Sequence, residues 1–321
     1  MKLRILFTFA LTASLLSPVI RAEEGGSGHY MSGAAASFAD ALPGRPSLAL
    51  VNYFTYYGAS ANAGRPLPVG GLLTAGIDAT AYADTLGLIY ESPLRLLGGN
   101  YAGGIAVPYV WMDVKGQAQR IGAGGVPGPV FNVRDTANGI GDLTLYPFML
   151  GWTNGPDFKY DVRLGIYAPS GGYEPGRLAN AGKNYWTFEP GVSVSWLSSK
   201  IGTEVTLFAG FDISTKNDAT DYQSGEVFHL DGTVAQHLPL LGGFIGVGAN
   251  GFYYQQISGD SGSGARLGGF EGRTAGIGPV LSYARKVGEK DLVAEVKWLP
   301  ELDVTRRLQG DYIWFKLALA F

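Results

Sequence analysis

The stretch Tyr312-Ile-Trp-Phe-Lys-Leu-Ala-Leu-Ala-Phe321 decides the fold class. Side chains of an extended strand alternate between two faces, so every second residue back from the terminal phenylalanine shares a face. That face is wholly apolar and consists of Ile313, Phe315, Leu317, Leu319 and Phe321. Such a strand is typical of the closing strand of an outer-membrane β-barrel, where the apolar face meets lipid and serves as the membrane-insertion signal for the barrel-assembly machinery. The last strand of a soluble sandwich is the alternative.

The first residues predict export. Lys2 and Arg4 form a basic region, and the apolar run from Ile5 to Leu16 is too short to span a bilayer. We predict a signal peptide over residues 1–22, cleaved near Ala22. Downstream of that position no stretch of apolar residues is long enough for a spanning helix. An exported chain that still enters a membrane must then do so as a closed barrel.

Composition agrees with an outer-membrane barrel. Charged residues make up 16% of the 321 residues and hydrophobic residues 46%, whereas about 25% charged is usual for soluble domains. Barrel strands dilute a lipid-facing half with a lumen-facing half, which explains this balance. The chain has no cysteine, which excludes disulfides and Cys-based metal or nucleophile sites. The net charge of −3 argues against nucleic acid as a partner.

Alternating apolar and polar residues predict an all-β, antiparallel, up-and-down transmembrane barrel of about twelve strands, within a range of ten to fourteen. A lead over residues 23–47, acting as a periplasmic plug or a disordered leader, precedes the barrel at 48–321. Short turns and longer Gly/Asn/Asp-rich links alternate, as in barrels with tight periplasmic turns and long outer loops. The predicted strands are 48–58, 76–90, 100–117, 139–152, 158–169, 185–198, 202–214, 226–238, 243–256, 273–286, 290–300 and 311–321.

Charged residues on these strands must face the lumen. An Arg or Lys that points into lipid costs about 2–4 kcal/mol at the bilayer midplane. The strands near 76–90 and 100–117 do not separate into two faces, so their orientation stays unassigned. The predicted lumen-lining residues are Tyr146, Phe148, Lys159, Asp161, Arg163, Tyr167, Glu189, Glu204, Phe208, Asp212, His229, Asp231, Phe252, Tyr254, Glu295, Lys297, Tyr312, Trp314 and Lys316.

Catalytic and metal chemistry has little support. The three histidines show no spacing typical of metal ligands, so we predict no metal site and no cofactor. A barrel hydrolase would need a serine, a base and an acid. Ser193, Ser195, His229 and Asp231 could be imagined in those roles, but nothing in their spacing selects them.

Several motifs carry a family resemblance. They include Gly139-Ile-Gly-Asp-Leu-Thr-Leu-Tyr-Pro147, Gly165-Ile-Tyr-Ala-Pro-Ser-Gly-Gly172 and Asn184-Tyr-Trp-Thr-Phe-Glu-Pro190. Shorter ones are Gly176–Asn180, Glu24–Tyr30, Phe38–Pro43, Tyr253–Gln256 and Gly276–Pro279. Through them nearly the whole mature chain resembles the meta-pathway phenol-degradation family of outer-membrane proteins. The resemblance implies a transporter-like barrel associated with breakdown of aromatic compounds, and it brings no catalytic residues.

Three functions remain open from the sequence. The first is a channel in the bacterial outer membrane for small apolar or aromatic solutes, with an aromatic lumen that is either open or plugged. The second is a barrel hydrolase acting on lipids or envelope peptides. The third is a structural or adhesive barrel that binds partners through its long loops. We favour the channel, which is not an enzyme and whose other partner is the lipid bilayer.

Overall fold

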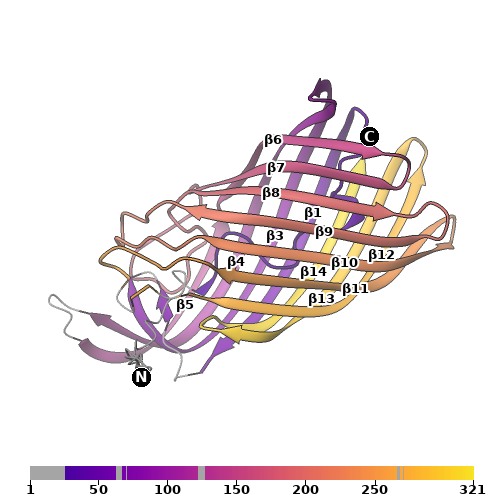
Figure 1. The fold of residues 1–321 in the computed structure, drawn as a ribbon. Helices are drawn as coiled ribbons and strands as arrows, with labels where there is room; N and C mark the ends of the chain where they lie inside the picture. The colour runs from indigo at the N-terminus through magenta and orange to yellow at the C-terminus, as the bar shows by residue number, and fades with distance from the viewer. Residues whose placement is uncertain (1–25, 63–66, 70, 122–126, 266–267, 270) are drawn as a thin grey trace, which may run out of the picture.

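The structure is a computed structural model that describes residues 26–62, 67–69, 71–121, 127–265, 268–269 and 271–321. Antiparallel strands form nearly all of its regular structure (Figure 1). The strands are β1 (Ser47–Ala61), β2 (Leu67–Val69), β3 (Leu72–Leu96), β4 (Gly99–Ile121), β5 (Pro127–Ile140), β6 (Leu143–Asn154), β7 (Phe158–Ala168), β8 (Thr187–Leu197), β9 (Thr203–Ser214), β10 (Val227–Leu240), β11 (Gly243–Gln256), β12 (Arg273–Val287), β13 (Lys290–Thr305) and β14 (Gln309–Ala320).

Twelve of these strands close into a barrel. β1 pairs with β14 on one side and with β3 on the other, so the first and last strands of the barrel meet. In the β1/β14 seam Leu50 lies opposite Leu319, and Phe54 lies opposite Phe315. This closure leaves no open edge in the ring, as a membrane-spanning sheet requires. The predicted fold class and the count of about twelve strands are confirmed.

β2 and β5 are additions to the ring. The first part of β4, Asn100–Ala106, pairs with β6, and its later part, Tyr109–Ile121, pairs with β5. Among the described strands, β5 pairs with β4 alone. The predicted strands at 100–117 and 139–152 left residues 118–138 as a long link. That prediction is wrong, because residues 118–121 continue β4 and residues 127–138 belong to β5. The Gly- and Asn-containing sequence of β5 suggested a loop, but the long β4 offers it a backbone partner.

The two ends of the barrel differ in their connections. Tight turns join the strands at one end, as at Leu97-Gly98 and Leu241-Gly242, where both residues of each pair have positive φ. That conformation matches the two-residue hairpin turns that suit twisted strands. Longer links, such as 169–186 and 215–226, lie at the other end. Residues 48 and 321 exchange backbone hydrogen bonds near the tight-turn end, where β1 begins.

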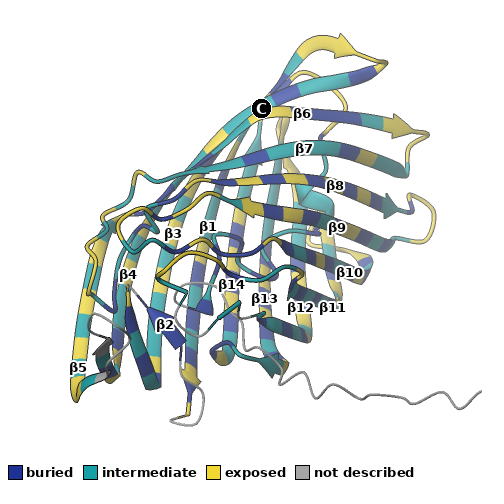
Figure 2. Ribbon diagram, turned by 60° about the vertical axis from the view of Figure 1, so that its left-hand side comes forward, coloured by how far each residue is buried: buried dark blue, intermediate teal, exposed yellow. Residues whose placement is uncertain are grey.

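Burial alternates along the strands (Figure 2). In β9 the outward residues Leu207, Phe211 and Ile213 are exposed, whereas Glu204 and Asp212 are buried. The same alternation runs through β8 from Thr187 to Ser195. The exposed exterior is thus apolar and the buried interior is mixed polar, which is the inverse of a soluble sandwich and fits a lipid environment.

Ser37 caps a 3-10 turn, η2 (Phe38–Asp40). Within the described ranges, no helix has the length and apolar character needed to cross a membrane. The predicted signal peptide and its cleavage near Ala22 lie outside the described residues.

Candidate functional site: the lumen of the barrel

The lead segment, defined here as residues 26–46, runs through the inside of the barrel. At one end Gly26 lies beside Leu67 and Leu308, near the long links. At the other end Gly44 lies beside Thr153, near a tight turn. The sequence left a periplasmic plug and a disordered leader as alternatives for this part of the chain. In the structure the lead segment extends through the lumen from the long-link end to the start of β1, and its role as a plug stays a prediction.

Two aromatic side chains hold the first part of the lead segment against β8, β10 and the link that precedes β6. His29 Nε2 lies 2.9 Å from Asp142 Oδ2, and its Nδ1 lies 2.8 Å from Thr187 Oγ1. The Tyr30 hydroxyl donates a hydrogen bond to Asp231, which is fully buried. The Tyr30 ring stacks on His229 with 3.6 Å between ring centroids. The His29 and Tyr30 side chains therefore each contact polar side chains of the barrel wall.

The middle of the lead segment is held through its backbone. Lys297 Nζ donates to the carbonyls of Gly33 and Ala35, each at 3.1 Å. Asp231 accepts from the backbone N–H groups of the same two residues, at 3.1 and 3.3 Å. Gly33 has φ +84, and a Cβ there would collide with Leu299, so only glycine fits this crossing.

One ion pair and two hydrogen bonds to buried carboxylates hold the last part of the lead segment. Lys316 Nζ lies 2.7 Å from Asp40 Oδ1. The backbone N–H of Phe38 donates to Glu204 Oε1 at 2.8 Å. Ser37 donates to Glu295 Oε2 at 2.6 Å. Buried charges of the barrel wall are thus satisfied by the lead segment, as groups buried in a low-dielectric interior must be.

The opposite wall, formed by β1, β3 and β4, is apolar inside. This apolar wall consists of Val51, Ile77, Ala79, Ala81, Ala83, Ile89, Ala106, Pro108, Val110, Met112 and Val114. The outward positions of the same strands include large exposed apolar residues such as Tyr82, Leu86 and Trp111. They also include the charged residues Asp78, Asp84, Asp113 and Lys115. Apolar residues therefore occur on both faces and charged residues on the outer one, which explains why alternation in the sequence could not orient these strands.

A cavity of about 670 Å³ lies between the apolar wall and the lead segment. Small side chains on β3 leave this space open, because alanines alternate along its inner face. Aromatic rings border it from β1 and β14. Tyr57 stacks on Tyr312 at 4.3 Å, and Trp314 stacks on Tyr312 at 6.4 Å. The volume is within the range of pockets for small molecules, about 300–1,000 Å³.

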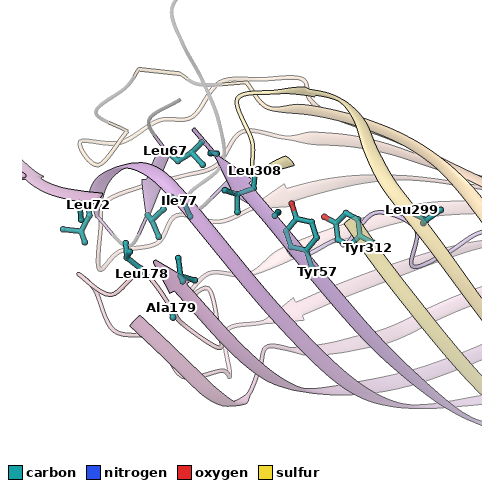
Figure 3. Packing of buried hydrophobic residues seen from close by; sticks show 14 of the residues in the cluster. Tyr57, Leu67, Leu72, Ile77, Leu178, Ala179, Leu299, Leu308 and Tyr312 are labelled. Atoms are coloured by element: carbon teal, nitrogen blue, oxygen red, sulfur yellow. The ribbon is translucent and has the colours of Figure 1, made fainter. Parts of the chain in front are cut away.

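An apolar cluster lies at the long-link end of the cavity (Figure 3). Leu67, Leu72 and Ile77 come from β2 and β3, and Leu178 and Ala179 come from the link between β7 and β8. Asp135 on β5 fixes that link. Its carboxylate accepts from Arg177 Nη2 at 2.5 Å and from the Leu178 N–H at 3.1 Å.

Replacement of Asp135 by alanine should release the link that carries Leu178. The variant loses the contacts with Arg177 and with the backbone of Leu178 and Ala179. Limited proteolysis of intact cells should then cut within 169–186 faster than in the parent protein, while the barrel stays folded on a gel. The exposed pair Arg45–Asp291 provides a control: Asp291→Ala should leave cleavage in 169–186 unchanged. Equal cleavage of Asp135→Ala and the parent would contradict the anchor.

Most predicted lumen residues lie on the buried face. Four others are partly buried and line the cavity, namely Tyr146, Lys159, Arg163 and Tyr167. The fully buried ones are Asp161, Glu189, Glu204, Phe208, Asp212, His229, Asp231, Phe252, Tyr254, Glu295, Lys297, Tyr312, Trp314 and Lys316. Whether they contact a passing solute stays a prediction.

Phe148 is a wrong assignment, because it is exposed on the outside. The register of β6 with β7 shifts between Leu145 and Phe148, so the alternation changes phase there. Tyr146 therefore keeps its inward position and Met149 becomes the next buried residue. In the closing strand, Ile313, Phe315 and Leu317 are exposed, as is Phe321, and Leu319 is half-buried.

The imagined hydrolase set is not assembled among the described residues. Ser195 Oγ pairs with Thr206 Oγ1 at 3.0 Å, and Asp231 bonds the lead segment. His229 instead faces two acids, Glu189 and Asp212, whose oxygens lie within 4.8 Å of its ring nitrogen and of each other. Three neighbouring strands thus bring together residues that no sequence spacing connects. The prediction of no metal site stays a prediction.

Comparison with solved structures finds outer-membrane proteins of similar fold, of which the first supports the barrel architecture. An outer membrane channel from Pseudomonas putida F1 shares 14% identity, with a TM-score of 0.58 over 91% of this chain and 100% of that one. The β domain of the Bordetella autotransporter Brka has 12% identity and a TM-score of 0.46 over 86% of this chain and 99% of that one. A Pseudomonas aeruginosa FadL homologue has 10% identity and a TM-score of 0.41 over 87% of this chain and 90% of that one.

No curated protein matches this sequence. A family model does match, over residues 63–317, which includes β2–β13 and most of β14. The resemblance seen in the sequence motifs is therefore confirmed. The chain belongs to the outer-membrane barrel family described as "Putative MetA-pathway of phenol degradation".

Proposed function

We propose that this protein is a passive channel of the bacterial outer membrane for small apolar solutes, chiefly aromatic compounds. The observation that carries the proposal is the apolar wall beside the cavity. The charged side chains of the lumen lie largely on the other wall, where many of them hold the lead segment. A solute beside β3 therefore meets alanine, valine and isoleucine side chains. This lining favours apolar molecules over sugars or ions.

The aromatic rings at the cavity support weak, reversible binding. An aromatic solute can stack on the rings around Tyr312 with a gain of about 0.5–1.5 kcal/mol per pair. Conduction needs binding that is strong enough for entry and weak enough for exit. A row of such rings beside small apolar residues satisfies both needs. It also requires no catalytic group, in keeping with passage without chemical change.

The lead segment acts in this proposal as a plug that narrows the lumen. Hydrogen bonds from its backbone to Asp231 on β10 and Lys297 on β13 keep it on that side of the lumen. The space that it leaves open is lined on the opposite side by the apolar wall. We also propose that the apolar face of β14 is the feature that barrel-assembly machinery recognises. Substitution within that face tests this second role.

Uptake measurements test the channel. We expect cells that express this protein to take up labelled phenol or toluene faster than cells that lack it. Both kinds of cell should take up sucrose at the same rate. Ala81→Phe fills the path on the inner face of β3 and should reduce uptake of the aromatic compounds. Leu86→Phe, on the outer face of the same strand, is the matched control and should not. No gain over protein-free cells would contradict the proposal, as would equal uptake by the two variants.

A further inference from the structure

Three buried side chains from neighbouring strands converge on the lumen side of β8–β10. They are Glu189 on β8, Asp212 on β9 and His229 on β10. His229 Nε2 lies 3.6 Å from Asp212 Oδ1 and 4.0 Å from Glu189 Oε2. We propose that these residues bind one divalent transition-metal cation of the Zn²⁺ class.

The distances suit such an ion. Zinc binds imidazole nitrogen and carboxylate oxygen at about 2.0–2.2 Å, so two ligands of a tetrahedral site lie about 3.4 Å apart. The observed separation of 3.6 Å between His229 Nε2 and Asp212 Oδ1 needs almost no adjustment. The 4.0 Å separation to Glu189 needs a shift of a few tenths of an ångström by one carboxylate. One nitrogen and two oxygens make a mixed donor set that such metals accept.

His229 is the second observation that indicates a ligand. Its side chain is fully buried, and neither ring nitrogen has a hydrogen-bond partner among the described residues. Buried polar groups in native proteins rarely lack a partner. The ring is nevertheless held in place, because it stacks on Tyr30 and lies over Gly210, where any Cβ would collide with it. The backbone of β9 is therefore shaped to let the imidazole reach the two acids.

Charge favours a cation here. With both acids ionised, the three residues together carry a negative charge even if the imidazole is protonated. The nearby Arg163 is engaged by Asp161 through two hydrogen bonds of 2.7 Å. A divalent ion would offset the repulsion between the two carboxylates, which a low-dielectric interior strengthens. Glu189 also lines the cavity, which gives the ion a route to the site.

Tyr167 is a positioning residue for the proposed site. Its hydroxyl donates to Glu189 Oε2 at 2.6 Å, and so fixes the orientation of that carboxylate. Partners of this kind orient metal ligands, and their loss lowers metal affinity about 10–100-fold. The Tyr167→Phe variant keeps the ring and removes only this hydrogen bond. It therefore separates orientation of the ligand from packing.

The test is Zn²⁺ binding by the full-length exported protein, purified in detergent from outer membranes without chelator. Elemental analysis and titration with Zn²⁺ should give one ion per chain. Asp212→Asn and His229→Asn should abolish stoichiometric binding, and Tyr167→Phe should weaken it about 10–100-fold. His237→Asn is the matched control, because His237 forms a buried pair with Glu204 alone, at 2.7 Å, and should bind zinc as the parent does.

A second readout does not depend on the variants. Co²⁺ added to the parent protein should give the visible absorption of a four- or five-coordinate nitrogen–oxygen site, and Zn²⁺ should displace it. The proposal is overturned if the parent binds no stoichiometric zinc and gives no cobalt spectrum. It is also overturned if His229→Asn and His237→Asn retain equal amounts of metal. Neither readout involves solute uptake, so the metal site and the channel can fail separately.

Discussion

Leu317→Arg should prevent stable insertion of the barrel or lower its free energy of unfolding by about 2–4 kcal/mol, as expected for arginine facing lipid near the bilayer midplane. Leu317 is 40% exposed and lies on the outer face of β14. In the sheet it is flanked by Asn52 of β1 and Ala294 of β13. No lumen group can therefore receive an arginine side chain at this position.

The adjacent residue provides the control. Ala318 lines the cavity, so an arginine there points into the lumen rather than into lipid. Ala318→Arg should fold, and it should reduce uptake of apolar solutes because it introduces a charge into their path. Heat-modifiable gel migration reports insertion, and urea unfolding in lipid vesicles reports stability. If the two variants fold equally well, the assignment of faces in β14 is wrong.

The double variant Asp231→Ala, Lys297→Ala should release the lead segment and open the barrel to ions. Together the two side chains make hydrogen bonds to the Tyr30 hydroxyl and to the backbone N–H and C=O groups of Gly33 and Ala35. Hydrogen bonds to charged groups contribute about 1.5–3 kcal/mol each. Loss of about 3 kcal/mol would raise the population of released lead segment about a hundredfold.

Conductance in planar bilayers measures that release. The double variant should show larger and more frequent ion currents than the parent protein. Ser195→Ala is a suitable control, because Ser195 is buried in the same wall but bonds Thr206 rather than the lead segment. Its conductance should equal that of the parent. A double variant that remains as closed as the parent would show that these contacts do not hold the plug.

Local alternation made most strands predictable. The strand expected at 243–256 has the same limits as β11, and the one expected at 158–169 differs from β7 by one residue. Each strand presents one face to lipid and one to the lumen, so apolar and polar residues alternate along its sequence with a period of two. β5 was missed, because its stability depends on the length of β4 and not on its own pattern.

The site was less predictable than the fold, because its contacts join distant parts of the chain. The sequence indicated that Lys297 and Asp231 face inward, but their partners are backbone groups of Gly33 and Ala35, which carry no side-chain signal. A shift in register moved Phe148 to the outer face. The approach of His229 to Glu189 and Asp212 likewise depends on strand register, which spacing along the chain does not reveal.

The path along the apolar wall can be located directly. Crystals of the protein soaked with 4-bromophenol should show anomalous scattering from bromine inside the barrel, between Ala81 on β3 and Tyr312 on β14. Ala81→Phe crystals treated in the same way should lose that peak. Bromine found only on the outer, lipid-facing surface, with the lumen free of it in the parent protein, would contradict passage of aromatic solutes through the barrel.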